Sequence, residues 1–76
     1  MKKLSREERA FFDARAELEE WTFAAKYVGL LTDAARVFGH EQTLASLEQA
    51  EATALHAKAN AQELLAEAER ELQRGG

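Results

Sequence analysis

Apolar residues in the first half of the chain recur with alternating spacings of three and four. One row is Leu4, Phe11, Leu18 and Ala25, and it is paired with the row Ala14, Trp21, Val28 and Ala35. This alternation is the a/d pattern of a helix that packs along one neighbouring helix. It predicts a single helix over about residues 5–38. The alternative is a break near Glu19 and Glu20, which would give a three-helix bundle, but a turn there would reset the phase of the repeat.

A second apolar row follows the same segment on another side of the predicted helix. It consists of Ala16, Phe23, Leu30 and Val37, with Tyr27 and Ala34 between them. The polar remainder is expected to form a narrow strip that faces water, made of Thr22, Lys26, Gly29, Thr32, Asp33 and Arg36. One neighbouring helix cannot cover two separate rows. We therefore expect the second row, supported by Phe12 near the helix start, to contact another protein chain.

Both ends of this helix carry recognisable signals. Ser5 followed by Glu8 fits a capping box at the start, and Gly39 suits the left-handed position that ends a helix. A new periodic pattern resumes after a turn over about residues 39–41, which predicts a second helix over about 42–74. Because the connection is so short, the second helix must run back antiparallel to the first. The sequence thus predicts one all-α domain over residues 1–76, a hairpin of two long helices.

The second predicted helix has small residues where the first has large ones, and it contains no aromatic residue. Its expected apolar face is Leu47, Ala50, Ala54, Ala57, Ala61, Leu64, Leu65, Ala68 and Leu72. Alanine at successive contact positions lets two helix axes approach closely. The opposite side carries Gln42, Ser46, Gln49, Thr53, His56, Asn60, Glu63 and Glu67, which we interpret as a solvated face.

Charge and composition narrow the possible functions. The net charge is −4, and all of it comes from residues 39–76, so binding to nucleic acid through a basic face is disfavoured. The chain has no cysteine, which excludes disulfides and thiolate metal sites. Lys26, Asp33 and Arg36 interrupt the most apolar segment, which argues against a membrane span. With a charged start in place of an export signal, we expect a cytoplasmic protein.

Catalytic signatures are missing from the sequence. His40 and His56 are the only histidines, sixteen residues apart, and neither belongs to a metal-binding spacing. No phosphate-binding glycine loop or nucleophile elbow occurs. We therefore expect a protein without a cofactor that is not an enzyme.

A chain of 76 residues has little core relative to its surface, so we expect contacts with another chain to stabilise it. We predict a small interaction protein, such as an adaptor, co-chaperone or inhibitor, that forms a homodimer or larger four-helix-type bundle and binds another protein. The expected interface is Phe12, Phe23, Tyr27, Leu30, Ala34 and Val37. The alternative is an oligomer that sequesters a small anionic molecule or nucleotide between protomers, with contacts from Arg15, Lys26, Tyr27 and Arg36.

Overall fold

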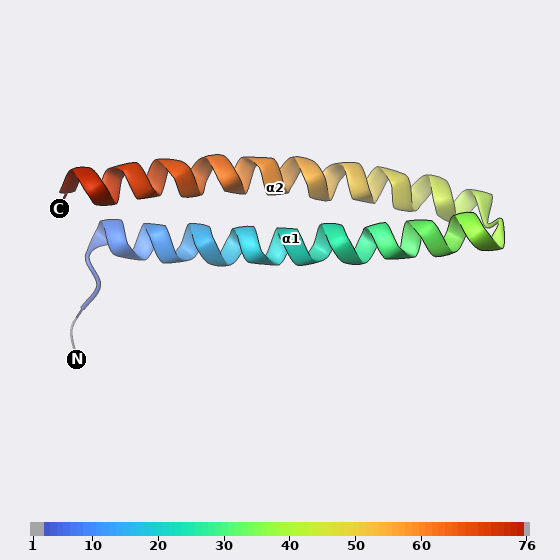
Figure 1. The fold of residues 1–76 in the computed structure, drawn as a ribbon, viewed down its shortest axis with the longest axis horizontal. Coiled ribbons are helices and arrows are strands. Elements are labelled where there is room, and N and C mark those ends of the chain that lie inside the picture. The colour runs from blue at the N-terminus through green and yellow to red at the C-terminus, as the bar shows by residue number, and fades with distance from the viewer. Residues whose placement is uncertain (1–2, 76) are drawn as a thin grey trace.

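Two antiparallel α-helices form the whole described fold. A computed structural model describes residues 3–75, with α1 spanning Arg6–Phe38 and α2 spanning Glu41–Gly75. The helices lie side by side along nearly their full length, so the start of α1 and the end of α2 lie at the end of the hairpin opposite the turn (Figure 1). The predicted all-α hairpin is confirmed. The three-helix alternative is wrong, because α1 runs through Glu19 and Glu20 without a break.

The start of α1 is fixed by the predicted capping box. The Ser5 hydroxyl accepts a hydrogen bond from the Glu8 amide at 3.1 Å, and the Ser5 amide donates to Glu8 Oε1 at 3.0 Å. Two amides that no helical carbonyl can reach are satisfied in this way. Glu7 and Glu8 also place negative charge at the positive end of the helix dipole.

The turn between the helices is a tight left-handed cap. Gly39 has φ 72° and ψ 26°, a conformation that residues with a Cβ adopt only at a cost. The His40 amide donates to the Ala35 carbonyl at 3.0 Å, and the Gly39 amide donates to the Arg36 carbonyl at 3.4 Å. This pair of bonds is a Schellman motif. It ends α1 sharply, so only Gly39 and His40 lie between Phe38 and the start of α2.

The interface between the helices is built from small side chains. The buried residues of the described chain are Ala14, Ala25, Ala35, Ala54, Ala61, Ala68 and Thr32. Larger side chains of the same rows, among them Trp21, Leu18 and Leu65, are only half-buried. The helices therefore bury mainly alanine methyl groups, and the bulky residues lie at the edges of the contact.

The water-facing strip predicted for α1 is wrong at two of its positions. Thr32 is 1% exposed, and Gly29 is half-buried against α2. Thr32 lies seven residues after Ala25, so it continues the inward row. Its hydroxyl donates to the Val28 carbonyl at 2.8 Å, and this bond satisfies the polar atom without a partner from α2.

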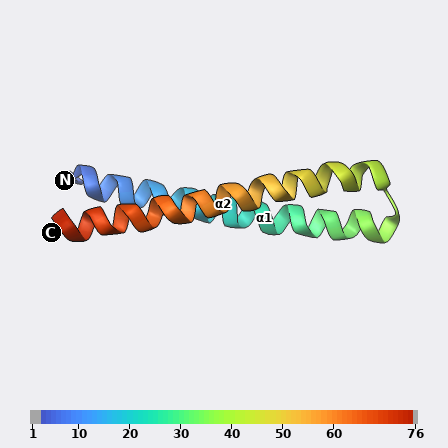
Figure 2. The same cartoon turned by 90° about the horizontal axis from the view of Figure 1, so that it is seen from above.

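On α2 the inward face is shifted slightly from the predicted one. Ala50 is exposed and Leu64 is 51% exposed. The inward positions follow two strict heptad rows, which are Leu47, Ala54, Ala61 and Ala68, and Leu44, Glu51, Lys58, Leu65 and Leu72. Figure 2 shows α2 crossing over α1 near mid-length, as expected of helices that coil around each other. Coiling favours the 3.5-residue repeat over the 3.6-residue repeat of a straight helix.

The hairpin is a single layer of helices. Its extents are 54 × 24 × 13 Å, and the shortest dimension is about one helix diameter. Its radius of gyration is 16.9 Å, whereas a compact domain of this length has about 11 Å. No second layer covers the outer faces of α1 and α2 in the described chain.

Candidate protein interaction surface

An apolar stripe runs along the outer side of α1 toward the turn. We call it the outer stripe and define it as Phe23, Tyr27, Leu30, Ala34 and Val37. Their spacing of four, three, four and three places them on one face of the helix. Phe23 is 71% exposed, Tyr27 56%, Leu30 61% and Val37 80%, and Ala34 is also exposed.

The outer stripe points away from α2 because of helix geometry. At 100° per residue, the buried positions Ala25, Thr32 and Ala35 lie on the side of α1 opposite Phe23 and Leu30. α1 thus has two apolar faces on opposite sides, and α2 can cover only one. No rotation of α1 within the hairpin would bury both.

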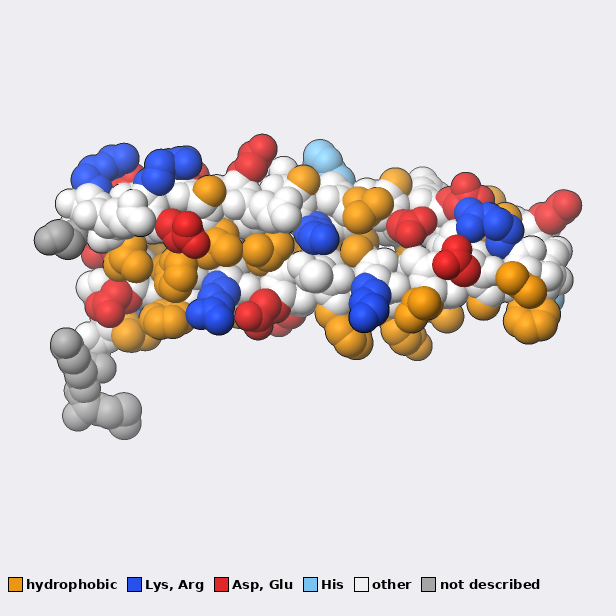
Figure 3. Space-filling model, viewed as in Figure 1, with side chains coloured by type: hydrophobic (Ala, Val, Ile, Leu, Met, Phe, Trp, Pro, Cys, Tyr) orange, Lys and Arg blue, Asp and Glu red, His pale blue; other side chains and the backbone are white. Residues whose placement is uncertain are grey.

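Two rings of the outer stripe stack on each other, and neighbouring side chains add to its apolar area. The Phe23 and Tyr27 rings are stacked, with centroids 6.3 Å apart and planes at 10°. Leu31 is 41% exposed and Phe38 is 73% exposed on one flank. In Figure 3, hydrophobic side chains protrude along the outer edge of α1 toward the turn. The result is a row of exposed apolar side chains over about the last four turns of α1.

Phe12 lies apart from this surface. It packs edge-on against Phe11, with ring centroids 5.5 Å apart, and helps to line a small hollow at the open end of the hairpin. Phe12 and Phe23 are about 16 Å apart along the helix axis, and the Arg15–Glu19 ion pair, with 3.6 Å between Nε and Oε1, lies between them. The structure places Phe12 beside the chain ends, outside the outer stripe.

The four residues predicted to contact an anionic ligand do not converge. Arg15 pairs with Glu19, and Arg36 pairs with Asp33 at 3.1 Å. Lys26 and Tyr27 are exposed on the same helix. Arg15 and Arg36 are separated by about 31 Å of helix, and none of the four lines the small hollow beside Phe12 or the groove described below. A pocket made from these residues would need a second chain, so the sequestering function stays a prediction.

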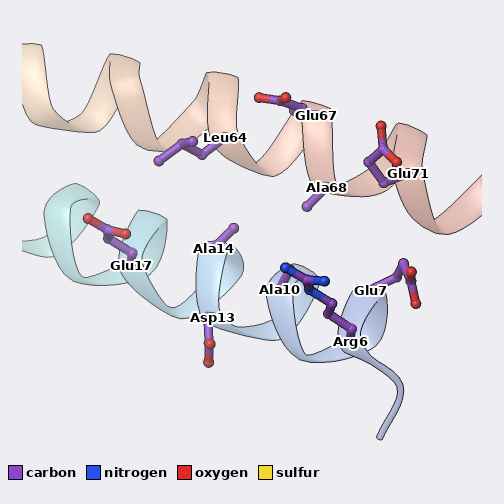
Figure 4. Close-up of a pocket in the computed structure, with 10 residues that line it drawn as sticks. All are labelled: Arg6, Glu7, Ala10, Asp13, Ala14, Glu17, Leu64, Glu67, Ala68 and Glu71. Atoms are coloured by element: carbon purple, nitrogen blue, oxygen red, sulfur yellow. The ribbon is translucent and has the colours of Figure 1, made fainter.

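An open groove between the helices was not predicted from the sequence. Its volume is about 620 Å³, and it lies near the chain ends. Its lining residues are Arg6, Glu7, Ala10, Asp13, Ala14, Glu17, Leu64, Glu67, Ala68 and Glu71. Figure 4 shows Leu64, Ala14 and Ala68 directed into the gap and Asp13 directed away from α2. The groove forms because Ala10, Ala14 and Ala68 are too small to fill the space between the helices.

The acidic residues around this groove do not form a metal site. Within residues 3–75, no group of three or more histidine, aspartate or glutamate side chains is arranged to hold a metal ion. The groove is therefore a small-residue gap with carboxylates at its rim, and the outer stripe is the stronger candidate for a functional surface.

Comparison with known proteins gives no relative to guide the assignment. No protein family matches the chain, and neither the curated proteins nor the solved structures contain a significant match. Neither helix of the described residues is long and apolar enough to cross a membrane.

Proposed function

We propose that this chain is a small helical protein–protein interaction module that works by presenting the outer stripe to another protein chain. Such a module could serve as an adaptor, a co-chaperone or an inhibitor, acting as a homo-oligomer of four-helix type. One observation carries the proposal. The buried residues of the described hairpin are alanines and Thr32, while its large residues Phe23, Tyr27 and Leu30 are exposed.

The amount of exposed surface supports this interpretation. The accessible surface is 6184 Å², whereas a compact protein of 8.5 kDa exposes about 4,700 Å². The excess of roughly 1,500 Å² reflects the single layer of helices. A stable interface removes about 600–1,000 Å² from each partner, so the hairpin has enough uncovered surface to form one without changing its fold.

The distribution of polar residues supports the choice of α1 over α2. The row on α2 that contains Gln49, Thr53 and His56 is exposed throughout, as expected of a solvated face. The outer stripe, in contrast, would be an aggregation hazard if no other chain covered it. The outer side of α1 is therefore suited to bind another chain, and the polar row of α2 is suited to remain in water.

The test compares wild type with the double variant Tyr27→Glu/Leu30→Glu. We expect the double variant to lose oligomeric mass in light scattering and to lose specific partners in affinity capture from the native host, because two carboxylates cannot be buried in an apolar interface. The matched control is Ser46→Glu/Gln49→Glu, which adds the same charge at the same spacing on the exposed side of α2. Circular dichroism checks that both variants remain helical.

The control should keep both the mass and the partners of wild type. If the Tyr27→Glu/Leu30→Glu variant, still helical, kept the wild-type mass and captured the same proteins, the outer stripe would not be the interaction surface and the proposal would be wrong.

A further inference from the structure

We infer that the outer stripe docks against the outer stripe of a second copy in antiparallel orientation, with a two-fold axis close to Leu30. This inference rests on the proposed function, because it takes the outer stripe as the interface, and it adds the occupant and the geometry. It follows from the sizes, charges and areas of the exposed side chains.

The side-chain sizes match in this arrangement. A two-fold axis at Leu30 places opposite each other the residues whose numbers add to about 60. Phe23 then faces Val37 of the second copy, and Tyr27 faces Ala34 of the second copy. Leu30 faces its own equivalent. Large residues meet small ones twice, which lets two helices interdigitate closely.

The charges beside the stripe match in the same register. Lys26 and Asp33 are exposed on the same flank of the outer stripe, seven residues apart. In an antiparallel two-fold pair, like flanks of the two helices meet, so Lys26 lies opposite Asp33 of the second copy, twice per dimer. In a parallel pair, Lys26 would instead meet the flank that carries Leu31, an apolar neighbour. Charge therefore favours the antiparallel orientation.

Asp33 can take part because its present partner is exposed and local. Its Oδ1 accepts from Arg36 Nη1 at 3.1 Å within the same helix, and both side chains are more than half exposed. Lys26 has no carboxylate within ion-pair distance among residues 3–75. A second carboxylate oxygen of Asp33 remains for Lys26 of the second copy.

The exposed area is sufficient for a stable pair. With aromatic side chains of about 150–250 Å², the outer stripe together with Leu31 and Phe38 exposes on the order of 700 Å² per chain. Two copies would bury about 1,400 Å², which lies within the usual range of specific interfaces. The two-fold axis near Leu30 would lie close to the turn of each hairpin. The dimer would therefore be about 75 Å long, longer than the 54 Å of one hairpin.

Cysteine cross-linking tests the geometry, because the chain has no cysteine of its own. Leu30→Cys is expected to form a disulfide dimer under mild oxidation. Ala34→Cys is expected to form little, since its two copies would be offset by about 12 Å along the axis, beyond disulfide reach. Parallel docking would instead cross-link both variants, because each position would face its own equivalent. Cross-linking of both variants, or of neither, would overturn the inference.

A charge exchange gives an independent readout. Lys26→Asp is expected to raise the dimer dissociation constant by about tenfold through loss of two ion pairs and gain of repulsion. Lys26→Asp/Asp33→Lys should restore it to near the wild-type value, and sedimentation equilibrium measures both. No recovery in the double variant would overturn the register.

These results separate this inference from the proposed function. A wild-type dimer that Tyr27→Glu/Leu30→Glu disrupts, combined with the wrong cross-linking pattern, overturns only the antiparallel docking. A wild-type chain that stays monomeric at millimolar concentration overturns self-docking, while specific capture of another protein through the outer stripe would still uphold the interaction module.

Discussion

Gly29 offers a sharp test of how the two helices fit together. It lies inside α1 and is half-buried on the side toward α2. A Cβ placed on it would meet Glu51 Oε2 at 3.0 Å, and no other atom of the described residues outside α1's own backbone is closer. That oxygen is at the far end of a flexible side chain that is itself half-buried. Gly29→Ala therefore needs only a small shift of the Glu51 carboxylate.

The balance of these effects predicts a more stable hairpin. Alanine is favoured over glycine inside a helix by about 1 kcal/mol, and moving the carboxylate offsets only part of this gain. We expect Gly29→Ala to raise the free energy of unfolding by about 0.5–1 kcal/mol. For a chain of this size that corresponds to an increase in Tm of about 3–6 °C.

Gly39→Ala is the matched control, and its effect should have the opposite sign. A Cβ at Gly39 would meet nothing within 4 Å, but φ is 72°, and the left-handed conformation costs a residue with a Cβ about 1–2 kcal/mol. The same substitution thus stabilises where the backbone is helical and destabilises where it is left-handed. Urea and thermal unfolding, followed by circular dichroism at one protein concentration, measure both variants.

A double variant isolates the contact with Glu51. If the carboxylate limits the gain at Gly29, Gly29→Ala should stabilise the Glu51→Ala background more than it stabilises wild type, by a few tenths of a kcal/mol. A less stable Gly29→Ala protein in both backgrounds would refute the reasoning, because it would mean that the backbones of α1 and α2 approach too closely at this point for any Cβ.

Two further substitutions test the alanine interface and the helix start. Ala61 is 1% exposed, so Ala61→Leu is expected to lower the free energy of unfolding by about 1–3 kcal/mol through overpacking. Ala59→Leu on the exposed side of α2 should change the free energy of unfolding by less than about 0.5 kcal/mol. Equal unfolding midpoints for the two variants would contradict close packing at Ala61. Ser5→Ala should lower the free energy of unfolding by about 1 kcal/mol and speed hydrogen exchange of the Glu8 amide. Ser5→Asp should keep this amide protected from exchange. Unchanged exchange in Ser5→Ala would show that the cap does not hold the first turn of α1.

The ends of the elements could be predicted from the sequence because local chemistry determines them. Ser5 and Glu8 form the two hydrogen bonds of the capping box within four residues, and Gly39 supplies a conformation that few other residues adopt. These signals lie within a few residues of the feature they specify. The hairpin itself follows from them, since a two-residue connection leaves the second helix no direction but back along the first.

The inward faces were predicted less well because they depend on how each helix is rotated about its own axis in the hairpin. Thr32 was assigned to water by its polarity, yet its heptad position places it in the contact with α2. Ala50 was predicted to lie on the inward apolar face of the second helix, yet it is exposed. The predicted and observed faces of α2 share the heptad row Leu47, Ala54, Ala61 and Ala68, and the rotation of α2 about its axis decides which flanking row is covered.

The open groove near the chain ends could not be predicted from the sequence of either helix alone. It arises where Ala10 and Ala14 of α1 come level with Ala68 of α2, and this coincidence depends on the register of the hairpin.

The thin alanine contact also bears on why the outer stripe should be covered. A buried alanine removes about one methyl group from water, worth about 0.8 kcal/mol, whereas full burial of a leucine, valine or phenylalanine is worth about 1.5–3 kcal/mol. Burying the outer stripe would therefore stabilise the protein by an amount comparable to that gained from the buried alanines between α1 and α2. Under the proposed docking, α1 becomes the central helix, with α2 on one side and α1 of the second copy on the other. Folding and association are then coupled, because the helix with two apolar faces is fully covered only in the dimer.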